Sequence, residues 1–482
     1  MKALLIQPPH YYGKNTRPPQ QFHLGLGYIA RSLKNKGHEL EVLDIYAHQY
    51  SDGEVENKIN GLGQDIDVVC ISALSTQYKY TKWLIKKLKA RFDKPIIVGN
   101  ALATFSTKIL LENSDVDICV IGEGEETIVE LLDNLGSVDK VLGVSYRKNG
   151  KICSTPPRPY IKNLDTIDPP LREVFPMSIY LDNCYLWGNP EIRATNIVTA
   201  RGCPFSCRYC SKTFSGVRLR TIKNVIKEIE SLREDYNVKA IYFNDELTLV
   251  NKQRSYELCD YFKKSKLRWV CQGRVDKVDM DLLKCMKDSG CVALGFGVES
   301  GSQRILDNMN KGIKIEQAIE AIKATKKVGI QPIIQMMYGY EGEDEESIAQ
   351  TVSFFKTINF PTMPFSPTTP LPGTVLYANA REKGLIKNED EYVEKLDWGY
   401  CSEREILINF TKFSNEEFTR RKAELERTIN SNYRKYLTTH PWVALKIIFK
   451  KIRSYYERYG LLKTFKRMTQ FKSYLEKERW MI

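Results

Sequence analysis

The sequence lacks any run of about 20 consecutive apolar residues, the length that a membrane-spanning helix requires. Its first stretch, MKALLIQPP, is too short and too soon interrupted by proline to serve as a secretory signal. Both absences favour a cytoplasmic location. Cysteines are also few, twelve in 482 residues. In a reducing compartment we expect free thiols, and clustered cysteines suit a metal better than disulfides.

Acidic residues are scarce near the C-terminus. Between residues 431 and 482 there are thirteen Lys and Arg but three Glu, a net charge of +10, so this segment carries most of the +13 of the whole chain. Aromatic residues alternate with the cations, and the stretch WVALKIIFKKI is amphipathic. The composition suits a helical cap on the preceding domain, a helix lying on an anionic membrane, or, less well, a nucleic-acid contact.

Strand and helix patterns alternate through residues 1–140. Five apolar strands separated by helices predict an α/β fold with a doubly wound parallel sheet. Ligands of such sheets bind beyond the carboxyl ends of the strands. Those ends read QPPH, ALST, VGNALA and IGEGEE, which are rich in the small residues that a large ligand pressed on backbone requires.

The pattern breaks at residues 141–190, where a hairpin with an Asn149-Gly150 turn precedes a proline-rich linker. About six further strand-helix repeats in residues 191–400 predict a barrel or partial (β/α)6 barrel, with its chemistry at the strand ends. Residues 401–482 are assigned to a helical basic C-terminal region. The proline-rich stretch at residues 363–374 is either a rim of the substrate pocket or a simple connector.

Three cysteines, Cys203, Cys207 and Cys210, lie in the stretch RGCPFSCRYC, directly after the first predicted barrel strand. A structural zinc site uses four ligands, usually as two separated C-x2-C pairs, and no second pair or nearby histidine is present. Three thiolates suit a [4Fe-4S] cluster with one iron left open for a substrate or cofactor.

This motif resembles the C-x3-C-x-aromatic-C signature of the radical SAM superfamily, with Tyr209 as the aromatic residue. In that family the open iron chelates S-adenosylmethionine, whose cleavage yields a 5′-deoxyadenosyl radical. The resemblance implies that Asp245 and Glu246 in FNDELT contact the methionyl ammonium and that Arg274 in CQGRVD pairs with its carboxylate. A helix cap and an ordinary surface ion pair are the alternatives for these residues.

The stretch GFGVESGSQRIL resembles the glycine-rich strand end that contacts the cofactor in the same superfamily. Small residues allow adenosine to approach the strand, and Glu299 can accept ribose hydroxyls. In YGYEGEDEES, Tyr340 and Glu341 replace the Leu-Pro of many relatives, which leaves the role of that stretch open. The residues that match the glycine-rich motif are Gly297, Glu299, Ser300 and Gly301.

The order of the two domains resembles the cobalamin-binding class of radical SAM enzymes, over roughly residues 1–400. None of the five histidines follows the Asp-x-His-x-x-Gly pattern of many cobalamin domains, so no histidine ligand below cobalt is expected. A Rossmann-like domain without cobalamin is the alternative. The resemblance implies cobalamin contacts at Ser75, Thr76, Gly99, Asn100, Gly122, Glu123, Gly124 and Glu125.

The resemblance implies a C-methyltransferase acting on an unactivated carbon of a natural-product, lipid or pigment precursor, through a 5′-deoxyadenosyl radical and methylcobalamin. Rearrangement, cyclisation or oxidation with the same cofactors is the main alternative. A tRNA-methylthiolating enzyme is less favoured because Cys70, Cys119 and Cys153 do not form a second cluster motif. A sensor without catalysis is disfavoured, since cofactor contacts accompany the cysteines. A flavodoxin or ferredoxin is the expected electron donor.

Overall fold

The computed structural model describes residues 1–10, 21–186, 189–396, 406–445 and 448–449. Most of the predicted basic tail, residues 450–482, lies outside this description. The chain divides into two compact units. The first contains Met1–Cys184, Ala194–Thr248 and Thr369–Tyr400, and the second contains Tyr185–Arg193, Leu249–Thr368 and Cys401–Ile482.

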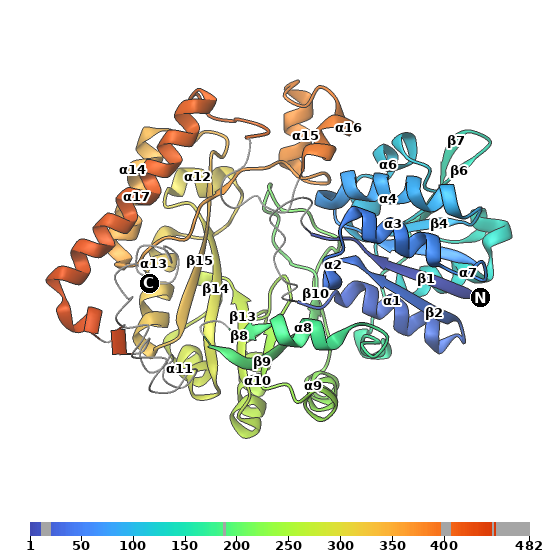
Figure 1. Ribbon diagram of the computed structural model, residues 1–482. Coiled ribbons are helices and arrows are strands. Elements are labelled where there is room, and N and C mark those ends of the chain that lie inside the picture. Colours follow the sequence, from blue (N-terminus) through green and yellow to red (C-terminus); the bar gives the residue numbers. More distant parts are fainter. Residues whose placement is uncertain (11–20, 187–188, 397–405, 446–447, 450–482) are drawn as a thin grey trace. The chain divides into compact units, whose positions relative to one another are not determined.

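The N-terminal part of the first unit is a seven-stranded sheet in the order β2-β1-β3-β4-β5-β6-β7 (Figure 1). The first five strands are parallel, as predicted, and the hairpin β6–β7 adds an antiparallel edge. The strand order reverses between β1 and β3, which is where ligands of doubly wound sheets bind. The strands are β1 (Lys2–Gln7), β2 (Glu39–Asp44), β3 (Val68–Ser72), β4 (Ile96–Gly99), β5 (Ile118–Val120), β6 (Val144–Lys148) and β7 (Lys151–Ser154).

Helices cover both faces of this sheet. In Figure 1, α1 lies below the sheet, and α4 and α6 lie above it. All five residues of β3 are buried, as expected for a strand covered on both faces. The helices are α1 (Leu24–Asn35), α2 (Ile45–His48), α3 (Asp52–Gly61), α4 (Tyr78–Arg91), α5 (Asn100–Phe105), α6 (Thr107–Asn113), α7 (Glu125–Asp133) and α8 (Met177–Asn183).

The turn between β6 and β7 has the predicted geometry. Asn149 and Gly150 have φ angles of 51° and 75°, and a type I′ turn requires positive φ at both central residues.

The remainder of the first unit contains the first strands of the predicted barrel. β12 pairs in parallel with the part of β9 that begins at Ala194, and the short strands β10 and β11 pair antiparallel. Helix α9 starts at Thr221, whose hydroxyl caps the helix by accepting from the backbone N–H of Asn224. The elements are β9 (Asn189–Ile197), β10 (Ala200–Arg201), β11 (Arg218–Leu219), α9 (Ile222–Tyr236), β12 (Ala240–Phe243), α15 (Val375–Glu382) and α16 (Glu389–Lys395).

The second unit holds four parallel strands in the order β13-β14-β15-β16, with helices between successive strands. The alternation along the chain confirms the predicted partial barrel fold. The elements are β8 (Tyr185–Leu186), α10 (Lys252–Ser265), β13 (Arg268–Gly273), α11 (Met280–Asp288), β14 (Cys291–Glu299), α12 (Gln303–Asn308), α13 (Ile315–Val328), β15 (Gln331–Tyr338), α14 (Glu345–Ile358), β16 (Ser366–Pro367) and α17 (Asn415–Thr439).

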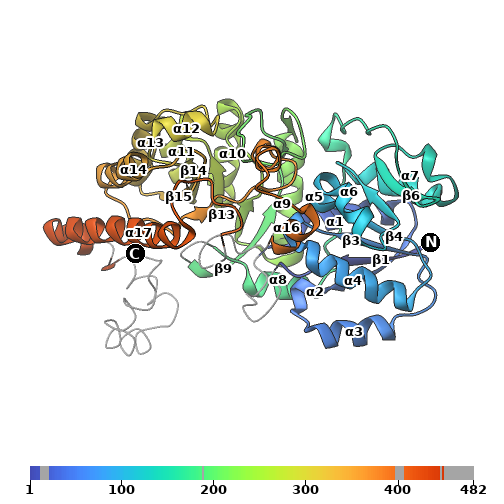
Figure 2. The same cartoon turned by 90° about the horizontal axis from the view of Figure 1, so that it is seen from above.

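Helix α17 lies in the predicted helical C-terminal region. Ser414 and Glu417 form a capping box at its start. The helix packs along α14 and buries Phe418, Leu425 and Ile429 (Figures 1 and 2). This stretch is therefore a packed helix. Within the described residues, no helix has both the length and the apolar character needed to cross a membrane.

Candidate cofactor sites

The three clustered cysteines lie in the loop between β10 and β11 of the first unit. The backbone N–H of Cys210 donates to the carbonyl of Cys207 at 3.2 Å, and Cys203 forms an isolated bridge with Ser215. The side chains of Cys203, Cys207 and Tyr209 are half-buried, and that of Cys210 is exposed. Three accessible thiols on one short loop are the soft donor set that an iron-sulfur cluster uses.

The thiols do not converge on one point. In the part of the chain that the structure describes, no three His, Cys, Asp or Glu side chains are arranged to hold a metal ion. The donor chemistry fits a cluster, and the final arrangement of such ligands is coupled to metal binding.

Gly202 fixes the start of this loop. Its φ angle is +90°, and a Cβ at this position would lie 2.3 Å from the carbonyl oxygen of Gly216. Both the left-handed backbone and the close approach therefore require glycine immediately before the first cysteine.

The carboxylates predicted to contact the methionyl group hold the chain that leads into this loop. One oxygen of Asp245 accepts from the backbone N–H groups of Thr199 and Ala200 at 2.5 and 2.9 Å, and the other accepts from the Thr199 hydroxyl at 2.7 Å. Glu246 accepts from the backbone N–H of Gly202 at 3.1 Å. Neither residue caps a helix, so their observed contacts position the cysteine loop.

Arg201 links the cysteine loop to the end of β5. Its guanidinium bonds to Glu123 at 2.7 Å and to Glu125 at 2.5 Å, and it lies over the Tyr28 ring. Arg218 also pairs with both oxygens of Glu123, at 2.9 and 2.8 Å. Burial alone lowers the pKa of Arg201, but the two carboxylates raise it, so the guanidinium stays charged. The sequence predicts these two glutamates as cobalamin contacts. In the structure both of them form ion pairs with arginines.

Sequence reasoning missed Arg201 and Arg218. Arg201 stands two residues before the first cysteine, and this adjacency was the available signal.

The other predicted cobalamin residues lie at the carboxyl ends of β3, β4 and β5. Ser75 and Thr76 are in a short 3-10 helix after β3, and the Thr76 hydroxyl is buried with no hydrogen-bond partner among the described residues. Asn100 and Gly122 have φ angles of 73° and 76°, and no atom approaches the positions of a Cβ on Gly99 or Gly122. An unpaired hydroxyl beside open backbone fits a large ligand that carries amide groups.

Two further residues at this edge have structural roles. Gln77 donates from its side-chain amide to the carbonyls of Pro8 and Pro9, at 3.0 Å each, which joins the loops after β1 and β3. Gly124 allows α1 to pack closely, because a Cβ there would lie 2.8 Å from Ile29.

Arg274, at the end of β13, belongs to the second unit. It is buried, and it donates to the carbonyls of Lys311 and Gly312 at 3.1 and 3.0 Å and to Asp276 at 2.9 Å. Arg274 therefore does form an ion pair, as the alternative predicted. The pair is not on the surface, however, because the Arg274 side chain is buried and also binds two backbone carbonyls.

The glycine-rich end of β14 is also in the second unit. Glu299 is 8 % exposed and pairs with Lys311 at 2.9 Å. The Ser300 hydroxyl accepts from the backbone N–H of Ser302 at 3.1 Å. Gly301 lets the strand end approach α14, since a Cβ there would lie 2.5 Å from the α-carbon of Thr351. Lys311 was missed at the sequence level, where nothing distinguished it from other loop lysines.

The chain contacts the cysteine loop just after the proline-rich stretch at residues 363–374. The backbone N–H of Leu376, at the start of α15, donates to the carbonyl of Arg208 at 2.9 Å. Gly373, with a φ angle of +84°, leaves no room for a Cβ, which would lie 2.2 Å from the Phe105 ring of α5. The end of the stretch therefore contacts the helix after β4, and the residues that follow it contact the cysteine loop.

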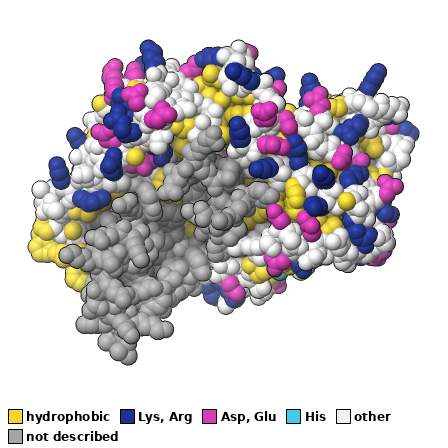
Figure 3. Space-filling view, turned by 45° about the horizontal axis from the view of Figure 1, so that its top comes forward, with side chains coloured by type: hydrophobic (Ala, Val, Ile, Leu, Met, Phe, Trp, Pro, Cys, Tyr) yellow, Lys and Arg dark blue, Asp and Glu magenta, His cyan; other side chains and the backbone are white. Residues whose placement is uncertain are grey.

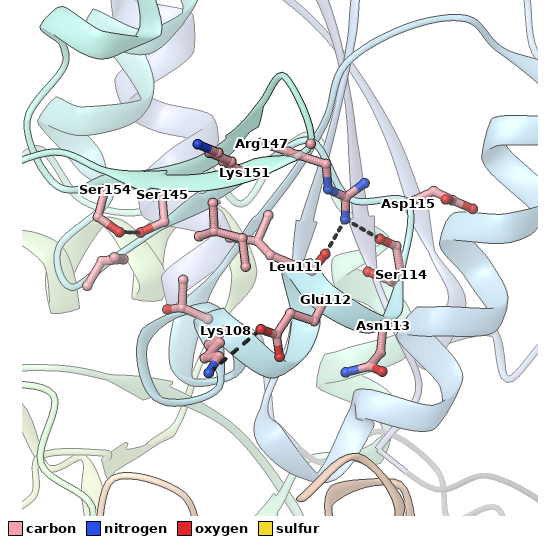
Figure 4. Close-up of a pocket in the computed structure, with 14 residues that line it drawn as sticks. Lys108, Leu111, Glu112, Asn113, Ser114, Asp115, Ser145, Arg147, Lys151 and Ser154 are labelled. Atoms are coloured by element: carbon pink, nitrogen blue, oxygen red, sulfur yellow. Dashed lines mark hydrogen bonds and ion pairs between the residues drawn. The ribbon is translucent and has the colours of Figure 1, made fainter.

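A hollow of about 1120 Å³ lies beside α6 and the β6–β7 hairpin (Figure 4). Arg147 donates to the carbonyls of Leu111 and Ser114, and Lys108 pairs with Glu112. The polar groups of this hollow are largely engaged with one another, and its lining includes none of the predicted site residues.

Two domain families match the chain. The description "Radical SAM superfamily" covers residues 197–355, and "B12 binding domain" covers residues 15–132. The chain is 29 % identical to an uncharacterized methyltransferase of Pyrococcus horikoshii, over 95 % of this chain and 99 % of that protein. It is 27 % identical to an anaerobic magnesium-protoporphyrin IX monomethyl ester cyclase of Rubrivivax gelatinosus, over 91 % of this chain and 81 % of that protein.

Among solved structures, the fold is similar to that of the radical S-adenosylmethionine methyltransferase TsrM from Kitasatospora setae, solved with cobalamin and a [4Fe-4S] cluster. The TM-score is 0.65 at 17 % identity, covering 80 % of this chain and 75 % of that one.

The protein is thus a radical SAM enzyme with an N-terminal B12-binding domain. More narrowly, its relatives include the methyltransferase and the cyclase named above. The cofactors predicted from the sequence, a [4Fe-4S] cluster, S-adenosylmethionine and cobalamin, are those of these two domain families.

Proposed function

We propose that the protein transfers a methyl group to an unactivated carbon of a small-molecule precursor. The supporting observation is the set of contacts that join the cysteine loop to the glycine-rich end of β5 within one compact unit. This arrangement suits a reaction that uses an iron-sulfur cluster and cobalamin in the same turnover. The similarity to a methyltransferase over nearly its whole length supports the same reaction.

We propose a role for each group of residues. The three cysteines hold the cluster, and the ends of β3, β4 and β5 hold cobalamin. The ends of β13 and β14 contact S-adenosylmethionine, through Arg274 and Glu299 among others. When bound, the cluster with S-adenosylmethionine supplies a carbon radical, and cobalamin supplies a transferable methyl group. Asp245, Glu246 and Arg201 position the cysteine loop through the contacts described above.

Cyclisation or oxidation is the second candidate, favoured by the 27 % identity to a cyclase over 91 % of the chain. Anaerobic reconstitution with iron, sulfide, cobalamin and S-adenosylmethionine, followed by product analysis, separates the two. Methyl transfer predicts both 5′-deoxyadenosine and S-adenosylhomocysteine, whereas cyclisation predicts the first alone. Replacing any cluster cysteine by Ala should abolish 5′-deoxyadenosine and leave cobalamin binding intact. Continued formation of 5′-deoxyadenosine in these variants would contradict the assignment of the cysteines.

The electron for cofactor cleavage comes, in this proposal, from a flavodoxin or ferredoxin. Reduction by each purified donor, followed through the spectrum of the cluster, tests this partner. The boundaries proposed for the functional regions are residues 1–140 for cobalamin, 141–190 for the linker, 191–400 for the barrel and 401–482 for the tail.

We also propose that this cytoplasmic enzyme touches a membrane surface through its tail. Trp442, Leu445 and Phe449 are 77 %, 39 % and 67 % exposed, and Trp442 and Leu445, three residues apart in a helical stretch, share one helix face. Hydrophobic side chains are visible at the end of α17 in Figure 3. Sedimentation with anionic and neutral vesicles tests the contact. Binding to anionic vesicles that survives the variant W442D/F449D would contradict it.

A further inference from the structure

The end of β14 carries an unusual backbone at a charged residue. Glu299 has a φ angle of +74°, a region that residues other than glycine, asparagine and aspartate seldom adopt. The pairing of β14 with β15 also shifts register between Gly297 and Glu299. Strain of this kind at a strand end is maintained by the surrounding structure and is concentrated at functional sites. The shift turns the Glu299 side chain back toward Gly297.

Gly297 makes room for the carboxylate. A Cβ on Gly297 would lie 2.5 Å from Oε1 of Glu299 and 3.1 Å from Nζ of Lys311. The ion pair therefore occupies the space that any other residue at position 297 would fill. The sequence analysis explained the absence of a side chain at Gly297 by the approach of adenosine. The structure shows that this absence also makes room for the ion pair between Glu299 and Lys311.

Backbone contacts and turns fix the position of Lys311. Its neighbours Asn310 and Gly312 have φ angles of 51° and 65°, so the loop turns sharply on both sides of it. Arg274 donates to its carbonyl at 3.1 Å. The side chain is buried and meets Oε1 of Glu299 at 2.9 Å. Among the described residues, the other oxygen of Glu299 has no hydrogen-bond partner.

We propose that Lys311 is a positioning residue that holds Glu299 so that its second oxygen can accept hydrogen bonds from a vicinal diol, such as that of a ribose. This inference rests on the proposed function, in which Glu299 contacts S-adenosylmethionine. Lys311 donates to Oε1 of Glu299 at 2.9 Å, which fixes that oxygen and leaves the second oxygen available to a ligand. The positive φ angle of Glu299 fixes the backbone from which the carboxylate extends.

The experiment measures binding of S-adenosylmethionine to the reconstituted full-length protein. Equilibrium dialysis gives the affinity, and the EPR spectrum of the reduced cluster reports whether the ligand reaches the iron. The variants are Lys311→Met, Lys311→Arg, Glu299→Gln and the double variant Glu299→Gln/Lys311→Met. Lys323→Met, an exposed lysine on α13 of the same unit, is the matched control.

Lys311→Met should weaken binding roughly tenfold or more, the effect expected for loss of a charge-assisted hydrogen bond. Lys311→Arg should retain most of the affinity, and Lys323→Met should bind as the wild type does. The double variant should bind no more weakly than Glu299→Gln alone, because Lys311 acts through Glu299. An analogue without the two ribose hydroxyls should bind equally to wild type and Lys311→Met.

Wild-type affinity in Lys311→Met, or losses that add in the double variant, would overturn the inference. The inference would also be overturned if Lys311→Met weakened binding of the analogue as much as binding of S-adenosylmethionine. If Lys311→Met does not fold, the affinity of the double variant compared with that of Glu299→Gln still tests the inference. The double variant is expected to fold because it leaves neither charge of the pair without its partner. Failure of the wild-type protein to bind S-adenosylmethionine would refute the proposed function itself, which is a separate result.

Discussion

The buried charges at the end of β5 lead to a prediction about Glu123. Its carboxylate accepts from Arg201 at 2.7 Å, from Arg218 at 2.9 and 2.8 Å and from the backbone N–H of Ile161 at 2.8 Å. Glu123→Gln keeps the shape but removes the charge, and it turns an amide N–H toward guanidinium N–H groups. Removing one partner of a buried ion pair costs about 3–5 kcal/mol of unfolding free energy.

The matched control is Glu126→Gln, one turn or less away on α7. Glu126 is exposed, and its ion pair with Arg158 is 3.8 Å long, so the same substitution should cost about 0–1 kcal/mol. Anaerobic urea unfolding gives both values. Iron content after reconstitution gives a second reading, because Arg201 leads directly into the cysteine loop. Equal stability of the two variants would refute the view that this network holds the loop, as would a full iron content in Glu123→Gln.

Three further outcomes are expected. Gly202→Ala should lose most bound iron without loss of cobalamin binding, since its Cβ would lie 2.3 Å from a carbonyl oxygen; normal iron content would contradict this. Burial raises the pKa of Glu343 to about 7 from 4.5, so the folded protein retains this proton after the unfolded chain has lost it. The contribution of Glu343 to stability should therefore fall as pH rises from about 4.5 to 7, and Glu343→Gln should gain about 3 kcal/mol over the wild type at pH 8 but little at pH 4, measured by denaturation. Gly373→Ala should lower unfolding stability by about 1–3 kcal/mol through its left-handed backbone and its contact with Phe105, and an unchanged unfolding midpoint would count against that packing.

The order of the elements could be predicted from the sequence because it depends on local signals. Apolar runs of strand length, helical spacing and a turn such as Asn149-Gly150 are each complete within about a dozen residues. The cysteine spacing is similarly local, and it is specific enough to indicate the chemistry. These signals predicted the parallel front sheet, the strand-helix repeats of the barrel and the location of the cysteine loop.

The partners of the buried charges could not be predicted in this way. Arg201 and Glu123 are far apart in the sequence, and their pairing depends on which strand ends become neighbours. The sequence predicts Glu123 and Glu125 as cobalamin contacts, and it gives no indication of the arginines that both of them contact. The pair of Glu299 with Lys311 depends on a positive φ angle and a register shift, neither of which has a sequence pattern outside glycine.

The boundaries of the two compact units differ from those of the two domain-family matches. The radical SAM match covers residues 197–355, yet residues 194–248, with the cysteine loop, belong to the same unit as the B12-binding domain. The contacts explain this grouping, since the loop is held by Glu123 and Glu125 from β5 and α7, by Asp245 after β12 and by Leu376 at the start of α15. These contacts fix the cysteine loop to the front sheet within one compact unit. The predicted cluster ligands and the predicted cobalamin residues are thereby placed on one folded unit, whereas Arg274 and Glu299, which are proposed to contact S-adenosylmethionine, belong to the other.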